Sequence, residues 1–424
     1  MPNFASLSLT RLQAKAPQRP ARALRSAYRL GEMHRTVSWS RGVRVGTNAG
    51  LRLRFARSVA VLVVTAAVVG AGCSSSQTAT PTLSSVPSPS PSPSPNPSPT
   101  KAAAGCHIGV LWDNYNYVEF WEAPAINAVF NREGVDWKEV ESKDSVDYQE
   151  SDIDSFVSDG VDVIIVRGIG YGSTSAAVTR ATAAGIPVIA EDSLLENPNV
   201  LWVSSDSVAV GRMEAQAVLA AKPKGKYVII KGHQDQVADL ERQGIGEVLQ
   251  PALDSGAIKI VAETYTENWD PFVAYTELLA ILRENHNQID AAIVENDGMA
   301  AGVIKALEEQ GLKGKVAVSG ATADVFGLQS VAAGTQTVDV WQDHRQLGTA
   351  AAEAAVELCR IHDMAMVSGA KQITSPAGNK MWQIQFQPQA ITRDNLNLAL
   401  DSGLITKNDL CTDVDPAAAP AVCR

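Results

Sequence analysis

The sequence has few cysteines and aromatic residues, and its basic residues are unevenly distributed. Only five of 424 residues are cysteine and 6% are aromatic, and no two cysteines have the C-x-x-C spacing of zinc or thioredoxin-like sites. Of the 36 Lys and Arg residues, 12 precede residue 73, where there is one acidic residue. From residue 73 onward, 24 basic residues stand against 45 acidic ones, a net charge of −21. Because nucleic-acid binding requires a basic surface, this composition excludes a nucleic-acid partner.

The sequence also lacks an apolar run long enough to span a membrane. Residues 59–72 form the apolar run VAVLVVTAAVVGAG, which is shorter than the roughly 20 residues that a membrane-spanning helix needs. Arginines precede this run, which is typical of an export signal. The residues before Cys73 resemble a bacterial lipobox, although Gly70 stands where that pattern has a bulky aliphatic residue. We expect a lipoprotein signal peptide over 1–72 and a lipid anchor on Cys73; the alternative is an ordinary signal peptide with an incidental cysteine.

Proline and serine dominate the stretch that follows. Residues 87–100 read PSPSPSPSPNPSPT. Alternating proline favours an extended polyproline II chain of about 3.1 Å per residue, so this part reaches on the order of 40 Å. We interpret residues 73–104 as a tether that holds a domain away from the membrane surface.

Beyond the tether, short β-branched runs alternate with helical patterns such as VGRMEAQAVLAA. We expect strands at 107–113, 135–141, 161–167, 186–192, 200–206, 226–232, 258–264, 290–297, 315–321 and 337–343. Continuous apolar strands separated by helices indicate parallel sheets covered on both faces. Ten strands are too many for one ordinary domain, so the sequence predicts an α/β protein with two doubly wound parallel-sheet lobes.

In such sheets, ligands bind beyond the carboxyl ends of the strands. The polar residues at these ends are Asp113, Asn114, Glu191, Asp192, Asp206, Glu295–Asp297, Thr322, Gln342 and Asp343, and the aromatic ones include Phe120, Trp121, Trp269 and Trp341. Aromatic faces beside amides and carboxylates suit a sugar, whose C–H faces stack while its hydroxyls form hydrogen bonds. The alternative is that several of these aromatic residues belong to the core.

A dinucleotide-binding motif is the competing interpretation for one strand end. The stretch RGIGYGS at 167–173 follows a strand and opens a helix, with Glu191 and Asp192 about twenty residues on. Ser173 stands where the third glycine of that motif belongs, and an exported protein meets no nicotinamide pool. We therefore interpret the stretch as a structural turn, and we expect no catalytic residue, no cofactor and no metal.

Three segments carry a family resemblance: QIDAAIVENDGMAAG, GLKGKVAVSG and VAAGTQTV. They are similar to the C-terminal half of the xylose-binding proteins of ABC sugar importers, and the similarity extends more thinly from about His107 to residue 405. These proteins form the type I periplasmic solute-binding class. The resemblance implies two lobes joined by a three-segment hinge, a sugar ligand, an ABC permease as partner, no enzymatic activity and a monomer. A tethered sensor for a membrane receptor is the alternative.

The resemblance also implies domain boundaries. It assigns 105–206 plus 323–375 to an N-terminal lobe, 207–322 plus 376–405 to a C-terminal lobe, and 406–424 to a tail. Four cysteines remain if Cys73 is lipidated, and their even number suggests two disulfides with three possible connectivities. Alternatively, Cys359 is a buried thiol. The lobe assignment makes Cys106 with Cys359, and Cys411 with Cys423, the expected pairs.

The family's sugar site maps only partly onto this chain. Trp121, Asp192, Trp269 and Asn296 match its stacking tryptophans, acid and asparagine. Phe120 and Ser193 replace arginines, Thr322 replaces an aspartate, and Gln342 replaces a lysine but matches a glutamine of ribose-binding relatives. The expected ligand-binding residues are Asp113, Asn114, Phe120, Trp121, Asp192, Trp269, Asn296, Thr322 and Gln342. The changes put xylose specificity in doubt and leave a pentose-like or related sugar as the expected ligand, with a cationic solute as the alternative.

Overall fold

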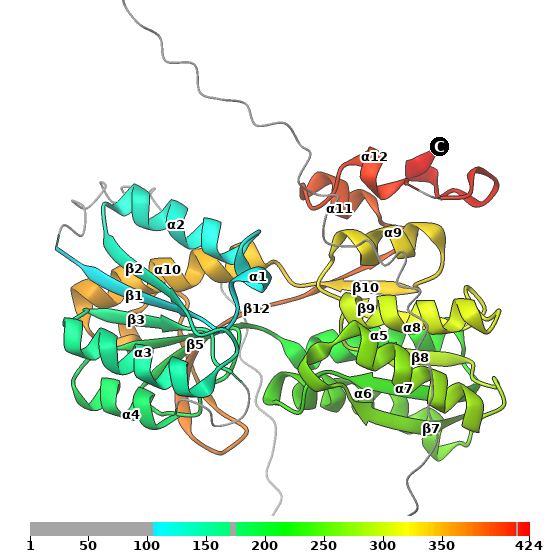
Figure 1. The fold of residues 1–424 in the computed structure, drawn as a ribbon, viewed down its shortest axis with the longest axis horizontal. Helices are drawn as coiled ribbons and strands as arrows, with labels where there is room; N and C mark the ends of the chain where they lie inside the picture. The colour runs from blue at the N-terminus through cyan, green and yellow to red at the C-terminus, as the bar shows by residue number, and fades with distance from the viewer. Residues whose placement is uncertain (1–104, 170–174, 413) are drawn as a thin grey trace, which may run out of the picture. The chain divides into compact units, whose positions relative to one another are not determined.

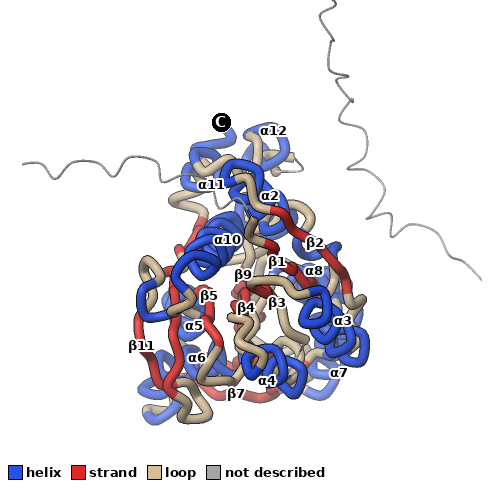
Figure 2. Tube along the Cα trace, turned by 90° about the vertical axis from the view of Figure 1, so that its left-hand side faces the viewer, coloured by secondary structure: helices blue, strands red, loops and turns tan. Residues whose placement is uncertain are grey.

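A computed structural model describes residues 105–169, 175–412 and 414–424. The expected signal peptide, the tether and Cys73 lie outside the described residues. Within them, two β-sheets are each covered by helices on both faces, and Figure 1 and Figure 2 show the strands enclosed between these helices. The predicted fold class, two doubly wound α/β lobes, is confirmed.

The first sheet has the strand order β11-β12-β5-β4-β3-β1-β2. Its strands are β1 (His107–Trp112), β2 (Asp136–Glu141), β3 (Val163–Val166), β4 (Val188–Glu191), β5 (Val200–Ser205), β11 (Lys371–Thr374) and β12 (Lys380–Phe386). All pairings are parallel except that of β11 with β12. Since successive side chains of a strand point to opposite faces, Val110 packs in one buried core and Leu111 in another.

Helices cover both faces of this first lobe. The core that contains Val110 is closed by α2 (Glu122–Glu133) and α10 (His344–Ile361), and the core that contains Leu111 is closed by α3 (Val146–Asp159) and α4 (Ser175–Ala183). A short helix, α1 (Tyr115–Val118), precedes α2. The strands are buried on both faces, which explains why they read as continuous apolar runs.

The second sheet has the strand order β13-β10-β9-β8-β6-β7. Its strands are β6 (Gly225–Lys231), β7 (Ile258–Tyr265), β8 (Ala291–Val294), β9 (Ala317–Ala321), β10 (Val338–Trp341) and β13 (Gln389–Thr392), of which only β13 is antiparallel to its neighbour. One face packs on α5 (Ser207–Ala221) and α6 (Gln236–Asp254), and the other on α7 (Pro271–Glu284) and α8 (Asp297–Glu309).

The chain passes between the two sheets three times. It crosses after β5 at Asp206, after β10 at residues 342–343, and after β12 at residues 387–388. The second and third crossings correct the expected lobe boundaries. Residues 325–341, expected in the first lobe, belong to the second because β10 forms hydrogen-bonded ladders with β9 and β13. Residues 376–386, expected in the second lobe, belong to the first because β12 pairs with β5.

The described residues contain two disulfides: one joins distant parts of the chain, and the other lies within the tail. Cys106, before β1, is bonded to Cys359 near the end of α10, and Cys411 is bonded to Cys423. These are the two pairs named above. Helix α11 (Asn397–Asp401) and the tail helix α12 (Lys407–Leu410) lie beside α9 (Val325–Ala333) in Figure 1 and share an apolar cluster with it. The tail therefore completes the core of the second lobe.

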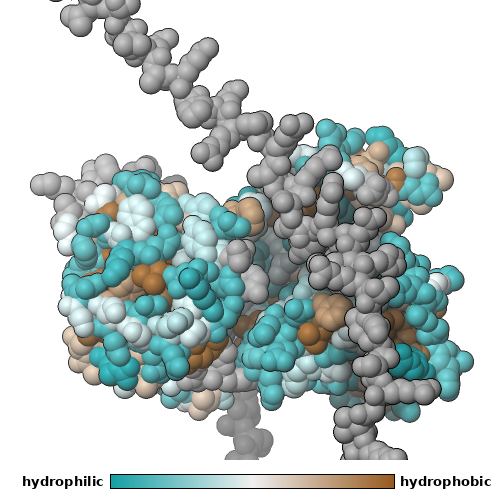
Figure 3. Space-filling model, in the orientation of Figure 1, coloured by the Kyte–Doolittle hydropathy of each residue, from teal (hydrophilic) through white to brown (hydrophobic). Residues whose placement is uncertain are grey.

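The face of the described residues that Figure 3 shows is mostly polar. Figure 3 shows hydrophilic residues over most of the visible face, with apolar ones scattered among them. The most exposed large apolar side chains include Phe272 and Met366 at 70% and Phe120 at 62%. None of the helices in the described part of the chain has both the length and the apolar character that crossing a bilayer requires.

Candidate functional site

In the first lobe, strand ends bring four carboxylates around one arginine. Arg167 follows β3, Asp113 follows β1, Glu191 ends β4, Asp192 follows it, and Glu122 begins α2. The guanidinium nitrogens of Arg167 lie 2.8 Å from Asp192, 3.1 Å from Glu122, 3.5 Å from Asp113 and 3.7 Å from Glu191. Two predicted site residues, Asp113 and Asp192, thus share one cation.

Burial governs the charges of this cluster. Glu191 is fully buried, and the side chains of Arg167, Asp113 and Asp192 are 15%, 16% and 18% exposed. Burial raises the pKa of Asp113 to about 6, although the charge of Arg167 opposes the rise. Burial also raises the pKa of Glu191 well above its usual value. Because a buried carboxylate is costly unless it is partnered, Arg167 is the group that permits several acids to lie here together.

An ion pair ties this cluster to the second crossing. Nδ1 of His344, the first residue of α10, lies 2.7 Å from the carboxylate of Glu122. Burial opposes the charge of His344, but Glu122 raises its pKa to about 9. Burial likewise opposes ionisation of Glu122, yet the charges of His344 and Arg167 lower its pKa to about 2. Both groups are therefore ionised at neutral pH.

Trp121, expected to stack on a sugar, lies beside Glu122 and faces a cation. The guanidinium carbon of Arg345 lies 5.3 Å from the centroid of the Trp121 ring and 6.0 Å from that of Trp341. Arg345 also pairs with Asp343 at 3.0 Å and donates a hydrogen bond to the carbonyl of Ser402 at 2.9 Å. Since Trp121 belongs to the first lobe and Trp341 to the second, Arg345 touches both lobes at the second crossing.

Two other predicted residues lie near the first-lobe cluster. The backbone N–H of Asn114 donates to the carboxylate of Asp113 at 2.7 Å, and its side-chain amide donates to Asp144 at 2.7 Å. Phe120 is 62% exposed and precedes Trp121. That Asn114 and Phe120 contact the ligand remains a prediction.

In the second lobe, three predicted residues follow three neighbouring strands. Asn296 follows β8, Thr322 follows β9 and Gln342 follows β10. The side-chain oxygen of Asn296 accepts from the backbone N–H of Met299 at 2.7 Å and so caps α8. Gln342 is 9% exposed. Because the carboxyl ends of parallel strands share one edge of the sheet, these side chains lie along that edge.

A buried carboxyl pair supports this edge. Asp297 is fully buried and accepts hydrogen bonds from Gln336 at 2.8 Å, Thr322 at 3.3 Å and the backbone of Asp324 at 3.1 Å. Burial raises the pKa of Asp297 well above its usual value, with a further rise from Asp339. Burial also raises the pKa of Asp339 to about 7, although a hydrogen bond from Asp297 opposes the rise. Burial therefore favours the protonated form of both carboxyl groups.

Strained backbone marks three of the predicted residues. Asp192, Trp269 and Thr322 have φ values of 60°, 54° and 105°, in the region that favours glycine. Such conformations cost about 1–3 kcal/mol each and are maintained where the surrounding structure enforces them, often at functional sites. The strain is a second, independent reason to place a site at these strand ends.

The lobes also make contact away from the crossings. Leu240 of α6 packs against the first-lobe core that contains Leu111. The side-chain amide of Gln236, which begins α6, donates to the carboxylate of Glu196 at 3.4 Å. The N-terminal end of α6 therefore touches the first-lobe loop that follows Asp192.

Sequence reasoning missed Arg167, Glu122 and His344. Arg167 directly follows an apolar strand, so the strand-end rule could have selected it, but it was assigned to the strand itself. Glu122 and His344 are paired across two distant segments, and no local pattern indicates such a contact. Among the described residues, one group has metal-ligand geometry, Cys106 with Asp162 and Cys359, but both sulfurs are bonded to each other.

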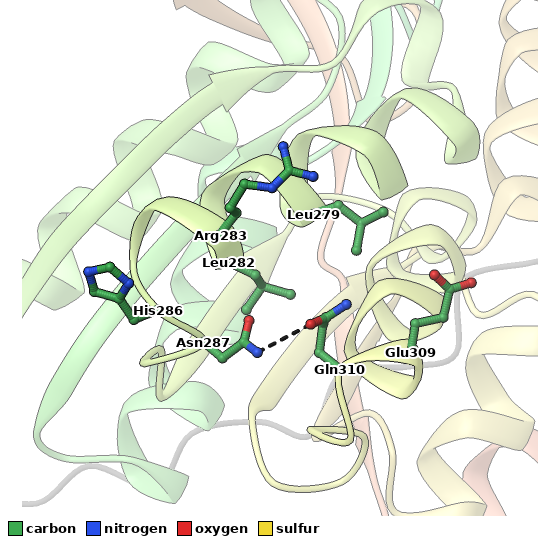
Figure 4. A pocket seen from close by; sticks show the side chains of 7 residues that line it. All are labelled: Leu279, Leu282, Arg283, His286, Asn287, Glu309 and Gln310. Atoms are coloured by element: carbon green, nitrogen blue, oxygen red, sulfur yellow. Dashed lines mark hydrogen bonds between the residues drawn. The ribbon is translucent and has the colours of Figure 1, made fainter.

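A pocket of about 430 Å³ lies elsewhere on the second lobe (Figure 4). It is lined by Leu279, Leu282, Arg283, His286, Asn287, Glu309 and Gln310. The amide of Asn287 donates to Gln310 at 3.2 Å across it. These residues lie at the carboxyl ends of α7 and α8, whereas the candidate site lies at the carboxyl ends of the strands. The pocket is thus separate from the candidate site.

The fold agrees with the comparison to known families. Residues 108–362 match the model of the periplasmic binding protein domain, which is more than half of the chain. The protein belongs to the periplasmic binding protein family.

Relatives of known name include sugar-binding members of this family. The D-xylose-binding periplasmic protein of Escherichia coli (strain K12) is 39% identical over 212 residues, which is 50% of this chain and 64% of that protein. The xylitol-binding protein of Mycolicibacterium smegmatis (strain ATCC 700084 / mc(2)155) is 30% identical over 263 residues, 61% of this chain and 69% of that protein. The expected similarity to xylose-binding proteins is confirmed, although the chain spans less than two thirds of that relative's length.

Solved structures share the fold. A carbohydrate transporter solute-binding protein from Chloroflexus aurantiacus, in complex with D-glucose, has a TM-score of 0.64 and 23% identity over 71% of this chain and 97% of that one. The Caulobacter myo-inositol binding protein bound to myo-inositol has a TM-score of 0.62 and 22% identity over 73% and 100%. At these identities, the likeness establishes the periplasmic binding protein fold and nothing more specific.

Proposed function

We propose that this periplasmic binding protein captures a sugar or polyol outside the cytoplasm and delivers it to an ABC importer. The observation that carries the proposal is the set of polar and aromatic side chains at the strand ends of both lobes, three of them held in strained backbone. The named relatives support it, because they include D-xylose-binding and xylitol-binding proteins.

In this proposal, the ligand contacts come from both lobes. Trp121 and Trp269 offer aromatic faces, and Asp113, Asp192 and Asn296 offer hydrogen-bond partners for hydroxyl groups. Asn114, Phe120, Thr322 and Gln342 complete the set of proposed contacts. Arg167 is already engaged by carboxylates, which favours an uncharged ligand over an acidic one.

The mechanism is capture without covalent chemistry. A ligand that contacts both lobes stabilises the conformation in which both sets of contacts form, and it shifts the population only by its difference in affinity for the two conformations. The permease would then recognise the ligand-bound conformation through the surfaces of the lobes. We propose that the binding unit is a monomer.

We further propose that the chain is anchored by a lipid on Cys73 after removal of residues 1–72, with 73–104 as the tether. The arginine-rich leader, the short apolar run and the Pro-Ser stretch support this anchoring. Mass spectrometry of the mature N-terminus tests it. A diacylated Cys73 is the expected result, and an unmodified N-terminal residue at another position would contradict it.

A thermal-shift screen tests the proposed function. Pentoses, hexoses, polyols and cationic metabolites are added to the purified protein, because a ligand that binds only the folded state raises the melting temperature. At 100 times the dissociation constant, linkage contributes about 2.7 kcal/mol. We expect stabilisation by at least one sugar or polyol. Stabilisation by amines with none by any sugar or polyol would contradict the proposal.

A further inference from the structure

The loop that carries Trp269 is fixed at both of its ends. The backbone N–H of the buried Thr266 donates to the carbonyls of Lys231 and Gly232 at 3.0 and 3.1 Å. At the other end, the carboxylate of Asp270 caps α7 by accepting from the backbone N–H groups of the next turn at 2.6 and 3.1 Å. Between these anchors, Asn268 and Trp269 both have left-handed backbone, with φ values of 55° and 54°. The loop is therefore held in a conformation that the local sequence disfavours.

One face of the Trp269 ring rests on the backbone at Gly232. A methyl group placed on Gly232 would lie 2.1–2.2 Å from three consecutive carbons of the six-membered ring. Such a position lies over the ring rather than beyond its edge, so any side chain at residue 232 would displace the ring. The backbone N–H of Gly232 donates to the buried carboxylate of Glu295 at 2.8 Å, which fixes this peptide in place.

The indole N–H of Trp269 is held by Asp235. The carboxylate of Asp235 accepts from the Trp269 side chain, and it also caps α6 by accepting from the backbone N–H of Ala238 at 2.9 Å. Burial raises the pKa of Asp235, and these hydrogen bonds oppose the rise. The Gly232 backbone thus limits where the ring lies, and the Asp235 carboxylate offers an acceptor for its indole N–H.

We propose that Gly232 and Asp235 are positioning residues that hold the Trp269 ring with one face on the backbone and the other available to stack on a sugar. This inference rests on the proposed function and deepens it. A cyclic sugar has a rigid, flat C–H face that can match such a ring, whereas an open-chain polyol does not. We therefore expect the binding of a cyclic sugar to depend more strongly on the orientation of the Trp269 ring than the binding of its open-chain polyol does.

Substitutions at the two residues separate positioning from folding. Gly232→Ala displaces the ring. Asp235→Ser keeps a side chain that can cap α6 but is too short to reach the indole. Gly246→Ala, on the same helix α6, is the matched control, because a methyl group there meets only the flexible end of Arg242. Binding of D-xylose and xylitol is measured by calorimetry on the purified chain, with the melting temperature as the check on folding.

We expect Gly232→Ala and Asp235→Ser to weaken D-xylose binding about fivefold to tenfold, the size of a lost stacking contact, and xylitol binding less. We expect Gly246→Ala to stay within about twofold of the wild type. If Gly232→Ala does not fold, the Asp235→Ser variant alone tests the positioning proposal. Wild-type affinity for D-xylose in the folded Asp235→Ser variant would overturn the proposal.

The near-ultraviolet circular dichroism of the ligand-free protein gives an independent readout. The band of Trp269 is identified as the difference between the wild type and Trp269→Phe. We expect that band to change in Gly232→Ala and Asp235→Ser and to persist in Gly246→Ala. If the wild type binds neither D-xylose nor xylitol, the proposed function fails for these ligands. In that case, a Trp269 band that is unchanged in Gly232→Ala and Asp235→Ser would overturn the proposed positioning as well.

Discussion

In the first lobe, two cations, Arg167 and His344, neutralise carboxylates at the strand ends, whereas in the second lobe Asp297 and Asp339 meet as a carboxyl pair. The described partners of that pair are amides, a hydroxyl and backbone N–H groups. The first half of the site is thus held by compensated charge, whereas burial in the second half favours uncharged carboxyl groups. The two halves should consequently respond differently to the loss of a partner and to pH.

The largest expected effect comes from removing the cation of the first half. Arg167→Met leaves buried carboxylates without a partner, and we expect a loss of about 3–5 kcal/mol in the free energy of unfolding, measured by urea titration at pH 7. The control is Arg180→Met, which removes an exposed pair with Asp154 at 2.8 Å and should cost less than about 1 kcal/mol. Equal effects of the two substitutions would contradict the first half of the comparison.

The carboxyl pair of the second half should weaken as pH rises. The pKa of Asp339 is raised from 3.8 to about 7, so folding favours its protonated form. Its contribution is fully present below about pH 3.8 and is lost as pH rises through about 7. We expect Asp339→Asn to flatten the fall in stability between pH 4 and 7, as measured by urea titrations across that range. A variant with the pH profile of the wild type would show that Asp339 does not titrate there.

The ion pair of the first half should weaken at higher pH. The pKa of His344 is raised from 6.5 to about 9 by Glu122, so its contribution is fully present below about pH 6.5 and is lost as pH rises through about 9. We expect the difference in unfolding free energy between the wild type and His344→Gln to shrink between pH 6.5 and 9.5. A constant difference over this window would contradict the ionised pair.

The smallest expected effect tests the contact between the lobes at the second crossing. Arg345→Met removes the cation near Trp121 and Trp341, and we expect a loss of about 0.5–1 kcal/mol in the free energy of unfolding, since the side chain is partly exposed. Arg345→Lys keeps the charge and should lose less. A loss as large as that of Arg167→Met would mean that the lobes are held together mainly at Arg345.

The sequence allowed the strand pattern to be predicted because the strands are buried on both faces. All ten expected strands are present within a few residues of the expected positions. Strands β11, β12 and β13 were missed because KQIT, KMWQIQF and QAIT mix polar and apolar residues, and they lie at or next to the sheet edges. The expected boundary near the second crossing is wrong because an apolar strand such as VDVW has the same sequence pattern whichever sheet it joins.

The site was predictable to the extent that it follows from strand ends. Asp113 and Asp192 were selected by that rule, and the structure brings them to one cation. Glu122 and His344, which pair with each other beside this cation, come from helix starts far apart in the chain, so only the three-dimensional fold reveals their contact. The same is true of Gly232, whose contact with Trp269 depends on two separate loops.

Hydrogen–deuterium exchange with and without the sugar or polyol that gives the largest thermal shift tests most directly whether both half-sites bind the ligand. The account predicts slower exchange in both lobes, at residues 113–122 and 190–194 of the first and 266–270 and 296–299 of the second. Protection confined to one lobe, or to the separate pocket at residues 279–287, would contradict it.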